Sequence, residues 1–359
     1  MNYTTMNNTS DSCGSVPYFS LPIVKRLSLE LRAVFVFRIG ANVISCPFVI
    51  LLNILVMVTV KAKRQLRTKS NITLACLATT DLAVGFVVQP LQIVLHSFML
   101  RGETGILCST LAKITVALNL RCVITSLNHF VVLSAERYLA IKHSFAYENL
   151  VTEVRIILAS GLVWAATIFL PMEDFWPANI RNVTKFVVLF MQFLFLVLVV
   201  YFNVSVYKEV RRNEKQIIAN QVSLEVKQKL LKNKKAFYCT IIVLLAMFLC
   251  YFPTSIIVIL ISFTKDSIPV NVKQAVFHLL TLFPTLNSLF NSLIYAVRIR
   301  YFRVAFIQLL SRKTIAEAEQ LGRNMFGPRK IQAVATTEQG ENRVGREDKA
   351  EQGNDTLNG

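Results

Sequence analysis

The sequence predicts an all-α membrane protein, a seven-transmembrane helix bundle followed by a short amphipathic eighth helix. Of the 359 residues, 54% are hydrophobic and the mean hydropathy is +0.50, whereas apolar residues make up roughly 45–50% of ordinary soluble domains. Only 17% of residues are charged, and they cluster between long uncharged runs. Helices are the open-chain structure that suits hydrocarbon, because each segment satisfies its own backbone N–H and C=O groups.

Seven apolar runs define the expected membrane helices, because a spanning helix needs about 20 mostly apolar residues. The runs cover residues 34–60, 70–96, 105–139, 156–172, 186–207, 236–263 and 275–297. The fourth run is short, and we expect it to extend at its inner end. Arg38, near the outer end of the first run, is expected to snorkel to the lipid headgroups.

The chain after the seventh run predicts a surface helix and a tail. Between Tyr301 and Leu310, apolar and basic residues alternate at helical spacing, which suits an amphipathic helix on the inner membrane surface. The expected domains are an extracellular N-terminal segment (1–33), the bundle (34–297), the surface helix (298–312) and a mostly disordered cytoplasmic tail (313–359).

Basic residues between the runs set the expected orientation. Residues 61–69 carry five Lys or Arg and no acid, and residues 208–235 carry nine Lys or Arg and three Glu. The alternate loops are nearly balanced in sign, so the basic loops are expected to be cytoplasmic, with the N-terminus outside and the C-terminus inside. The net charge of +18 therefore indicates topology and anionic lipid headgroups, and no nucleic-acid partner is expected.

Cysteines and glycosylation sequons fit this topology. Five of the seven cysteines lie well inside apolar runs, where a thiol is usually a small core residue; these are Cys46, Cys76, Cys122, Cys239 and Cys250. Four sequons lie in segments expected to be extracellular and are predicted glycosylation sites, namely Asn2, Asn7, Asn8 and, in the second outer loop, Asn182. Three others lie in or below the expected membrane and should stay bare.

Polar residues are costly inside membrane helices, and here they follow a recognisable order. The segments that contain them are Leu52-Asn53-Ile54-Leu55-Val56, Leu77 to Leu82 around Asp81, Glu136-Arg137-Tyr138, His143 to Tyr147, Trp164, Cys250-Tyr251-Phe252-Pro253 and Asn287 to Tyr295. Across about residues 34–310 this pattern resembles the rhodopsin-like (class A) G-protein-coupled receptors. The chain departs from the family motifs at four positions, with Glu136 for Asp, Ser144 for Pro, Tyr251 for Trp and Ser292 for Pro.

The resemblance implies a cell-surface receptor of the plasma membrane that binds an extracellular ligand and activates heterotrimeric G proteins. Arrestin and receptor kinases are further partners that it implies, although the tail offers them few hydroxyls. Two alternatives are a receptor-like protein that binds without coupling and a transporter, but no internal repeat is found. An enzyme is not expected, because no nucleophile–base set or metal triad is visible.

Asp81 is a lone carboxylate in the middle of the second run. The resemblance implies an allosteric sodium site in which the oxygen donors are Asp81, Ser126, Asn287 and Asn291. A hard cation prefers such a mixture of carboxylate, hydroxyl and amide oxygens. The alternative is a protonated or hydrogen-bonded structural acid. No other cofactor is expected.

The resemblance also implies an activation switch. Arg137 would contact the G protein in the active state, and Glu136, next to Tyr138, would restrain it at rest. Pro253 would be a pivot of the sixth helix, with Tyr251 and Tyr295 as moving aromatics. Many relatives also hold this arginine with an acid on the sixth helix, but Asn233 stands there, so we expect a weak restraint and appreciable basal signalling. The alternatives are an interfacial arginine and plain aromatic packing.

Candidates for the ligand pocket are Gln92, His96, Asn119, Arg121 and Tyr251. Asn119 stands where amine receptors keep an aspartate, so an amine ligand is not expected. Arg121 either snorkels to the outer headgroups or is a counter-ion, for an anionic ligand or for Glu173 or Asp174. The seventh run has no lysine, which excludes a retinal Schiff base.

The usual family disulfide is absent, because Ala112 replaces the cysteine of the third helix. Cys108 could pair instead with Cys13, which would tie the N-terminus over the pocket. The missing disulfide, together with a fifth run without proline, is similar to the melanocortin, cannabinoid and lysophospholipid receptor group. This similarity favours a peptide or lipid ligand.

Overall fold

The computed structural model describes residues 27–103, 110–169, 178–219, 224–263 and 268–311, and a few residues from 314 to 321. The described residues form helices and short connections, without strands. By its contacts the chain divides into two units, Met1–Phe306 and Ile307–Gly359. The first unit contains the helix bundle and every site discussed below.

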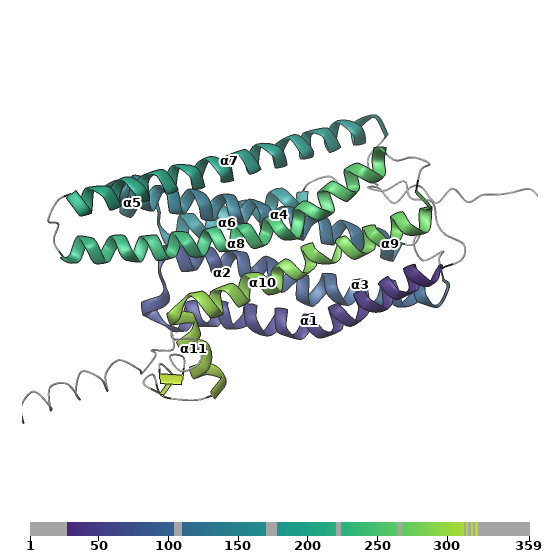
Figure 1. Ribbon diagram of the computed structural model, residues 1–359, viewed down its shortest axis with the longest axis horizontal. Coiled ribbons are helices and arrows are strands. Elements are labelled where there is room, and N and C mark those ends of the chain that lie inside the picture. Colours follow the sequence, from purple (N-terminus) through teal and green to yellow (C-terminus); the bar gives the residue numbers. More distant parts are fainter. Residues whose placement is uncertain are drawn as a thin grey trace, which may run out of the picture. The chain divides into compact units, whose positions relative to one another are not determined.

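The long helices follow the seven predicted runs in order (Figure 1). They are α1 (Leu29–Ala62), α2 with α3 (Lys69–Ala83 and Gln89–Leu100), α4 (Thr110–Lys142), α6 (Glu153–Phe169), α7 (Ala178–Ala219), α8 (Leu224–Phe263), and α9 with α10 (Val270–Leu280 and Leu282–Arg298). Short helices are η1 (Arg64–Leu66), η2 (Val84–Val88), α5 (Ser144–Leu150) and α11 (Arg300–Ser311). The predicted fold class is confirmed, including the eighth helix, which is α11.

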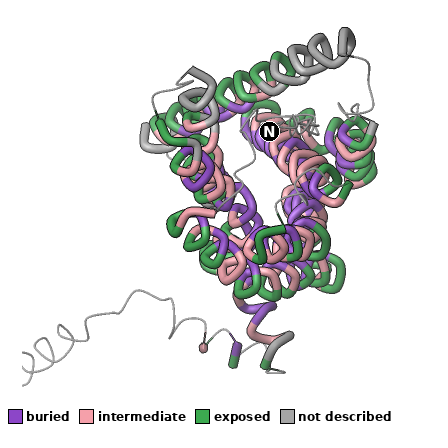
Figure 2. The backbone as a smooth tube through the Cα atoms, turned by 90° about the vertical axis from the view of Figure 1, so that its right-hand side faces the viewer, coloured by how far each residue is buried: buried purple, intermediate pink, exposed green. Residues whose placement is uncertain are grey.

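The bundle is apolar outside and partly polar inside. Large apolar side chains are exposed along the helices, for example Phe37, Phe48 and Leu162, whereas Asn53 and Asp81 are fully buried. Figure 2 shows the exposed residues on the outer faces of the helices and the buried ones facing inward. Among the described residues, six helical segments are long and apolar enough to cross a membrane. The helix α6, which follows the fourth predicted run, is not among these six; its described part has 17 residues, Glu153–Phe169. This distribution is typical of a multi-pass membrane protein.

The second membrane helix changes its winding halfway. A π-helical turn, η2, joins α2 to α3 just before Pro90, and such turns accommodate a proline that cannot continue the hydrogen-bond ladder. Gly85 lies in this turn, and a Cβ atom there would lie 2.9 Å from Cγ1 of Ile50. The glycine therefore allows α1 to approach the second helix closely, and Cys46 donates to the Gly85 carbonyl at 3.2 Å.

The seventh membrane helix is interrupted at Thr281, between α9 and α10. Pro284 lies three residues later, and a helical proline removes the hydrogen bond to the carbonyl four residues before it, here Leu280. The hydroxyl of Thr254 on α8 donates to this Leu280 carbonyl at 2.8 Å. The family motif would place its proline at Ser292, but α10 continues through that position.

Candidate functional site

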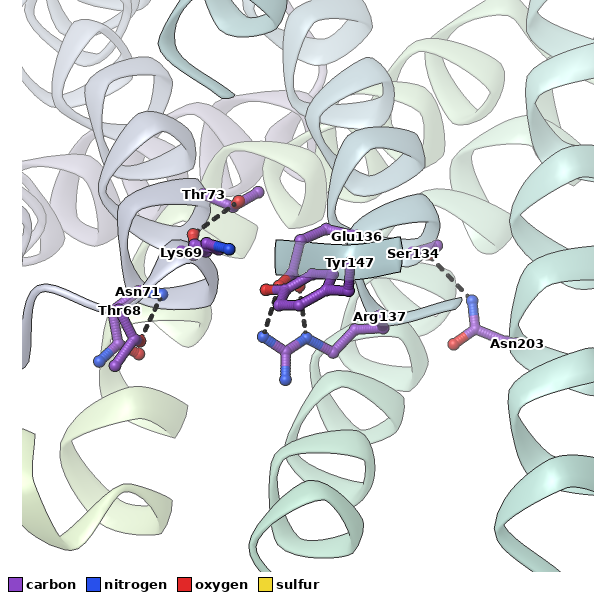
Figure 3. Close-up of polar contacts among 9 residues, drawn as sticks. All are labelled: Thr68, Lys69, Asn71, Thr73, Ser134, Glu136, Arg137, Tyr147 and Asn203. Atoms are coloured by element: carbon purple, nitrogen blue, oxygen red, sulfur yellow. Dashed lines mark hydrogen bonds and ion pairs between the residues drawn. The ribbon is translucent and has the colours of Figure 1, made fainter. Parts of the chain in front are cut away.

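A bidentate ion pair joins adjacent side chains near the end of α4. Arg137 donates from Nε to Glu136 Oε2 at 2.6 Å and from its terminal nitrogen to Oε1 at 3.1 Å. Both residues are buried: 4% of the surface of Glu136 and 6% of that of Arg137 are exposed. Figure 3 shows this pair facing Tyr147, whose hydroxyl donates to Glu136 Oε1 at 2.5 Å. The carboxylate is therefore held by its own helix and by α5. We call this group the Glu136 cluster, and the end of the bundle that contains it the Arg137 end.

Tyr147 is a functional candidate to which the sequence analysis gave no role. Burial raises the pKa of its hydroxyl, and the nearby negative charge of Glu136 raises the pKa further. The phenol therefore stays protonated at physiological pH and donates to the carboxylate. Lys69 lies over the Tyr147 ring, 4.6 Å from its centre, and pairs with Glu148 at 2.6 Å. The signal in the sequence that could have indicated Tyr147 was the motif that runs from His143 to Tyr147.

Tyr138, the third residue of the motif, belongs to the contact between α4 and α7. Its ring packs against Phe202, with centroids 5.3 Å apart, and against His143 at 5.7 Å. One turn earlier, Asn203 of α7 donates to the Ser134 hydroxyl at 2.9 Å (Figure 3). The structure thus separates Tyr138 from the two residues before it: the tyrosine faces α7, whereas the ion pair faces α5.

The four predicted sodium-site residues are all buried in the bundle. Asn291 donates to Asp81 Oδ2 at 3.1 Å, which links α10 to α2. Asp81 and Asn291 have no exposed surface, and Ser126 and Asn287 are at most 2% exposed. Asp81 Oδ1 and the side-chain oxygens of Asn287 and Asn291 have no hydrogen-bond partner. Buried oxygens without partners are costly, and a carboxylate with two amide oxygens suits a sodium ion.

The predicted moving aromatics lie in the central apolar core. Tyr295 is fully buried and Tyr251 is partly buried against the same cluster of side chains. The Tyr295 hydroxyl has no hydrogen-bond partner, although a buried phenol usually has one. Pro253 lies within α8. The structure therefore brings the two tyrosines into one core.

A second polar network lies at the opposite end, which we call the Arg38 end. Gln92 on α3 accepts from Arg38 and from Asn42, both at 3.3 Å, and donates to Asn119 at 3.4 Å. Gln89 donates to Ser45 at 2.8 Å. Three of the five predicted pocket residues, Gln92, His96 and Asn119, therefore lie at or near one network that joins α1, α3 and α4. Arg121 is partly exposed on α4, and Tyr251 packs in the central core.

The predicted snorkelling of Arg38 is wrong. Its side chain is 3% exposed and turns into the bundle, where it donates to the His278 carbonyl, to Thr281 Oγ1 at 2.5 Å and to Gln92. The acceptors for the guanidinium lie at and just before the interruption of the seventh helix, where Thr281 also offers its hydroxyl. The sequence did not indicate which face of α1 would meet α9.

Other predictions meet the structure only in part. Five cysteines are free thiols, as expected for core residues; these are Cys46, Cys76, Cys122, Cys239 and Cys250. Asn182 lies in α7, which begins at Ala178, so the predicted loop position is wrong. Cys13, Cys108, Asn2, Asn7 and Asn8 lie outside the described residues, as does the side chain of Asn233.

The fold and its buried polar motifs define a seven-helix membrane receptor. Residues 52–295 match the family described as 7 transmembrane receptor (rhodopsin family). Since this match covers more than half of the chain, the protein belongs to the rhodopsin family and is a G-protein-coupled receptor. Members of this family are receptors rather than enzymes, as the sequence predicted.

Individual relatives agree with the family. The chain is 27% identical to adenosine receptor A3 of Ovis aries over 284 residues, which are 72% of this chain and 84% of that receptor. It is 25% identical to the histamine H2 receptor of Rattus norvegicus, with 82% of each covered. It is also 25% identical to melatonin receptor type 1B-B of Danio rerio, over 72% of this chain and 77% of that receptor. The similarity to the melanocortin, cannabinoid and lysophospholipid receptor group stays a prediction.

Proposed function

We propose that this receptor lies in the plasma membrane with the Arg38 end outside and the Arg137 end in the cytoplasm, and that the state of the Glu136 cluster controls its coupling to G proteins. The observation that carries the proposal is the buried ion pair of Glu136 and Arg137, held by Tyr147. A buried arginine restrained by a neighbouring carboxylate can be released by a small change in helix packing. The segment 208–235, which carries nine Lys or Arg and three Glu, is expected to be cytoplasmic as well.

In the resting state, Glu136 and Tyr147 keep Arg137 against its own helix. Breaking the ion pair frees the guanidinium for the G protein, and loss of the Tyr147 hydrogen bond weakens the hold on Glu136. Among the described residues, the acid that pairs with Arg137 is Glu136, which belongs to the same helix. A restraint within one helix does not tie α4 to α8, and Asn233 supplies no acid from α8. We therefore expect appreciable basal signalling.

Pro253, Tyr251 and Tyr295 are proposed to transmit the change between the two ends. Pro253 removes one backbone hydrogen bond from α8 and so provides a pivot. Tyr251 and Tyr295 pack in the same core, so a shift of one ring requires the other to repack. The unpartnered Tyr295 hydroxyl would gain a hydrogen bond if an alternative packing offered it an acceptor.

Asp81, Ser126, Asn287 and Asn291 are proposed to hold a sodium ion. Bound sodium supplies a positive charge beside the Asp81 carboxylate in the middle of the bundle. The unpartnered oxygens of Asp81, Asn287 and Asn291 are the donors, and Ser126 adds a hydroxyl from α4. Holding α2, α4 and α10 together in this way favours the resting packing.

Arrestin and receptor kinases are proposed as further cytoplasmic partners, and glycans at Asn2, Asn7, Asn8 and Asn182 as outer modifications.

The test uses the purified full chain in lipid nanodiscs with a panel of heterotrimeric G proteins, and it measures guanine-nucleotide exchange without ligand. We expect exchange above that of empty nanodiscs with at least one G protein, and its loss in Arg137→Ala. A receptor that drives no exchange with any member of the panel would instead support the alternative, a binding protein that does not couple.

The sodium proposal has its own readout. Thermal unfolding is compared in sodium chloride and in choline chloride at equal ionic strength. We expect sodium to raise the unfolding temperature of the wild-type protein and not that of Asp81→Asn. Thr80→Ala is the control, because the Thr80 hydroxyl is a buried neighbour with no hydrogen-bond partner. An equal sodium effect in Asp81→Asn would refute the site.

A further inference from the structure

Arg38 is a buried cation whose described partners are all neutral. It donates to the His278 carbonyl, to the Thr281 hydroxyl and to the Gln92 amide oxygen. Within the described part of the chain, no Asp or Glu pairs with it. The described acids nearest to this end in sequence, Glu30 and Glu103, are exposed. A charge taken out of water without a counter-ion is costly, so this position favours an anion.

The network around Arg38 is not saturated. Arg38 Nε, His96 Nε2 and Gln89 Oε1 are buried and have no hydrogen-bond partner. His96 contacts the Gln92 carbonyl through Nδ1 at 2.5 Å, and because a carbonyl only accepts, Nδ1 carries the proton. Nε2 of the neutral ring is therefore an acceptor. The unused groups are a guanidinium N–H for an anionic oxygen and an imidazole nitrogen for a hydroxyl, as in a phosphate monoester or a hydroxy acid.

Aromatic and apolar side chains surround these groups. Phe35 packs against His96 and His278, with ring centroids 5.4 and 5.0 Å apart, and the two imidazoles are 5.6 Å apart. Leu31, Leu95, Met99 and Ala275 pack in the same region, from α1, α3 and α9. An apolar wall keeps the local dielectric low, which strengthens the attraction between the guanidinium and an anion.

The depth of Arg38 suits a ligand that enters from its end of the bundle. Arg38 lies nine residues after the first residue of α1, and His278 lies eight after the first of α9. At 1.5 Å per residue, both lie about 12–14 Å from the helix ends. The Gln92 amide, which Arg38 contacts, also contacts Asn119, so the guanidinium borders the predicted pocket.

We propose that Arg38 recognises an anionic oxygen group, a carboxylate or a phosphate, of the receptor's ligand, and that His96 Nε2 can accept from a hydroxyl of the same ligand. The anion gives the guanidinium its missing charged partner, and the neutral acceptors on α3 and α9 are released in exchange. Because Arg38 joins α1 to the interruption of the seventh helix, binding changes the contacts of Thr281 and His278. This inference rests on the proposed function, since it names the ligand class of the same pocket.

The experiment measures thermal unfolding of the purified full chain with defined anions at constant ionic strength, with chloride as the reference. One arm uses soluble probes, inorganic phosphate and acetate. The other uses lipid-borne probes, lysophosphatidate and oleate in mixed micelles. We expect a saturable rise of roughly 2–4 °C with at least one probe, and the arm that responds tells whether the anion is free or carried by a lipid. If no probe in either arm raises the unfolding temperature, the proposal is wrong.

Two variants and a control make the result specific. Arg38→Gln should lose the rise, whereas Arg32→Gln should keep it, because Arg32 is exposed on the same helix. Arg38→Gln could fold poorly, so Gln92→Glu is the second variant. It places a carboxylate beside Arg38, and should raise the unfolding temperature without a probe and abolish the response to probes. A response that persists in Gln92→Glu would overturn the proposal.

The readout separates this inference from the proposed function. Nucleotide exchange is measured on the same preparations. Exchange without any response to anions would leave the receptor function intact and refute the anion site. A response to anions that depends on Arg38, without exchange, would support the site and refute coupling.

Discussion

Tyr147 restrains Glu136 from outside the helix that carries the ion pair. Its phenol donates to Glu136 Oε1 at 2.5 Å, and burial keeps that phenol protonated by raising its pKa. A single hydroxyl on α5 therefore adds to the restraint on Arg137. Hydrogen bonds to charged groups contribute about 1.5–3 kcal/mol, which is enough to change the balance between two receptor states.

Replacing Tyr147 by Phe should raise basal signalling. The variant removes the hydrogen bond and keeps the ring beside Lys69, so the resting state loses stability relative to the active one. We expect basal nucleotide exchange to rise by roughly tenfold. Glu148→Gln is the control, because Glu148 is 76% exposed in its pair with Lys69 and should have no effect. Equal basal exchange in Tyr147→Phe and wild type would contradict the restraint.

Ser292 makes a contact that the proline of the family motif could not make. Its hydroxyl donates to Asn53 Oδ1 at 2.8 Å, and Asn53 in turn donates to the Val49 carbonyl at 2.8 Å. All of these groups are buried. The substitution of serine for proline therefore exchanges a helix kink for a side-chain link between α10 and α1.

Ser292→Ala should destabilise the bundle. The variant leaves the Asn53 oxygen buried without its donor, which costs about 1–3 kcal/mol. We expect a lower unfolding temperature in detergent. Ser97→Ala is matched to it, because the Ser97 hydroxyl bonds only within its own helix, to Ile93, and its loss should cost less. The same loss of stability in both variants would show that the link to Asn53 contributes nothing.

At the scale of the element, the second membrane helix depends on Gly85. The π-helical turn brings its backbone against α1, and an added Cβ atom would meet Ile50 at 2.9 Å and Val49 at 3.0 Å. Both neighbours are side-chain carbons within a packed interface. One residue without a side chain therefore sets the distance between two helices.

Gly85→Ala should lower stability, whereas Gly40→Ala should not. The first variant overpacks the contact with α1, at a cost of about 1–3 kcal/mol. Gly40 lies on α1 with nothing within 4 Å of an added Cβ, so alanine there should be neutral or stabilising because it lowers the entropy lost on folding. Thermal unfolding of both variants measures the difference. If Gly85→Ala had the same unfolding temperature as the wild type, α1 would be able to move away without cost.

The seventh helix is interrupted at a different place from the proline of the family motif. Pro284 lies three residues after the interruption at Thr281, Thr254 donates to the Leu280 carbonyl that the proline frees, and Arg38 donates to the His278 carbonyl. The bend therefore lies nearer the Arg38 end than the motif would place it. A ligand that binds Arg38 would therefore act next to the interruption of the helix.

At the scale of the whole molecule, the uneven distribution of charge sets the proposed orientation. Lys and Arg concentrate in residues 61–69 and 208–235, and such loops stay in the cytoplasm. An epitope added before Met1 should therefore bind antibody on intact cells, and one added after Gly359 only after permeabilisation. Surface staining in intact cells is the measurement, with a cytoplasmic protein as the control. The opposite pattern would invert every assignment of outer and inner ends.

The sequence by itself determined the helices, their order and the motifs that they carry. In hydrocarbon each segment satisfies its backbone within itself, so composition along the chain is enough to find membrane helices. The positions of Asp81, Arg137 and Tyr295 within these helices followed from the motifs along the same segments. The roles of these residues stay predictions until the variants above are measured.

Only the tertiary structure decided which polar side chains meet. It turned Arg38 inward to the seventh helix, brought Tyr147 to Glu136 and joined Ser292 to Asn53. These contacts depend on how each helix is rotated about its axis and on which helices are neighbours. Those quantities come from packing between segments up to 243 residues apart in sequence, which a pattern read along one segment does not contain.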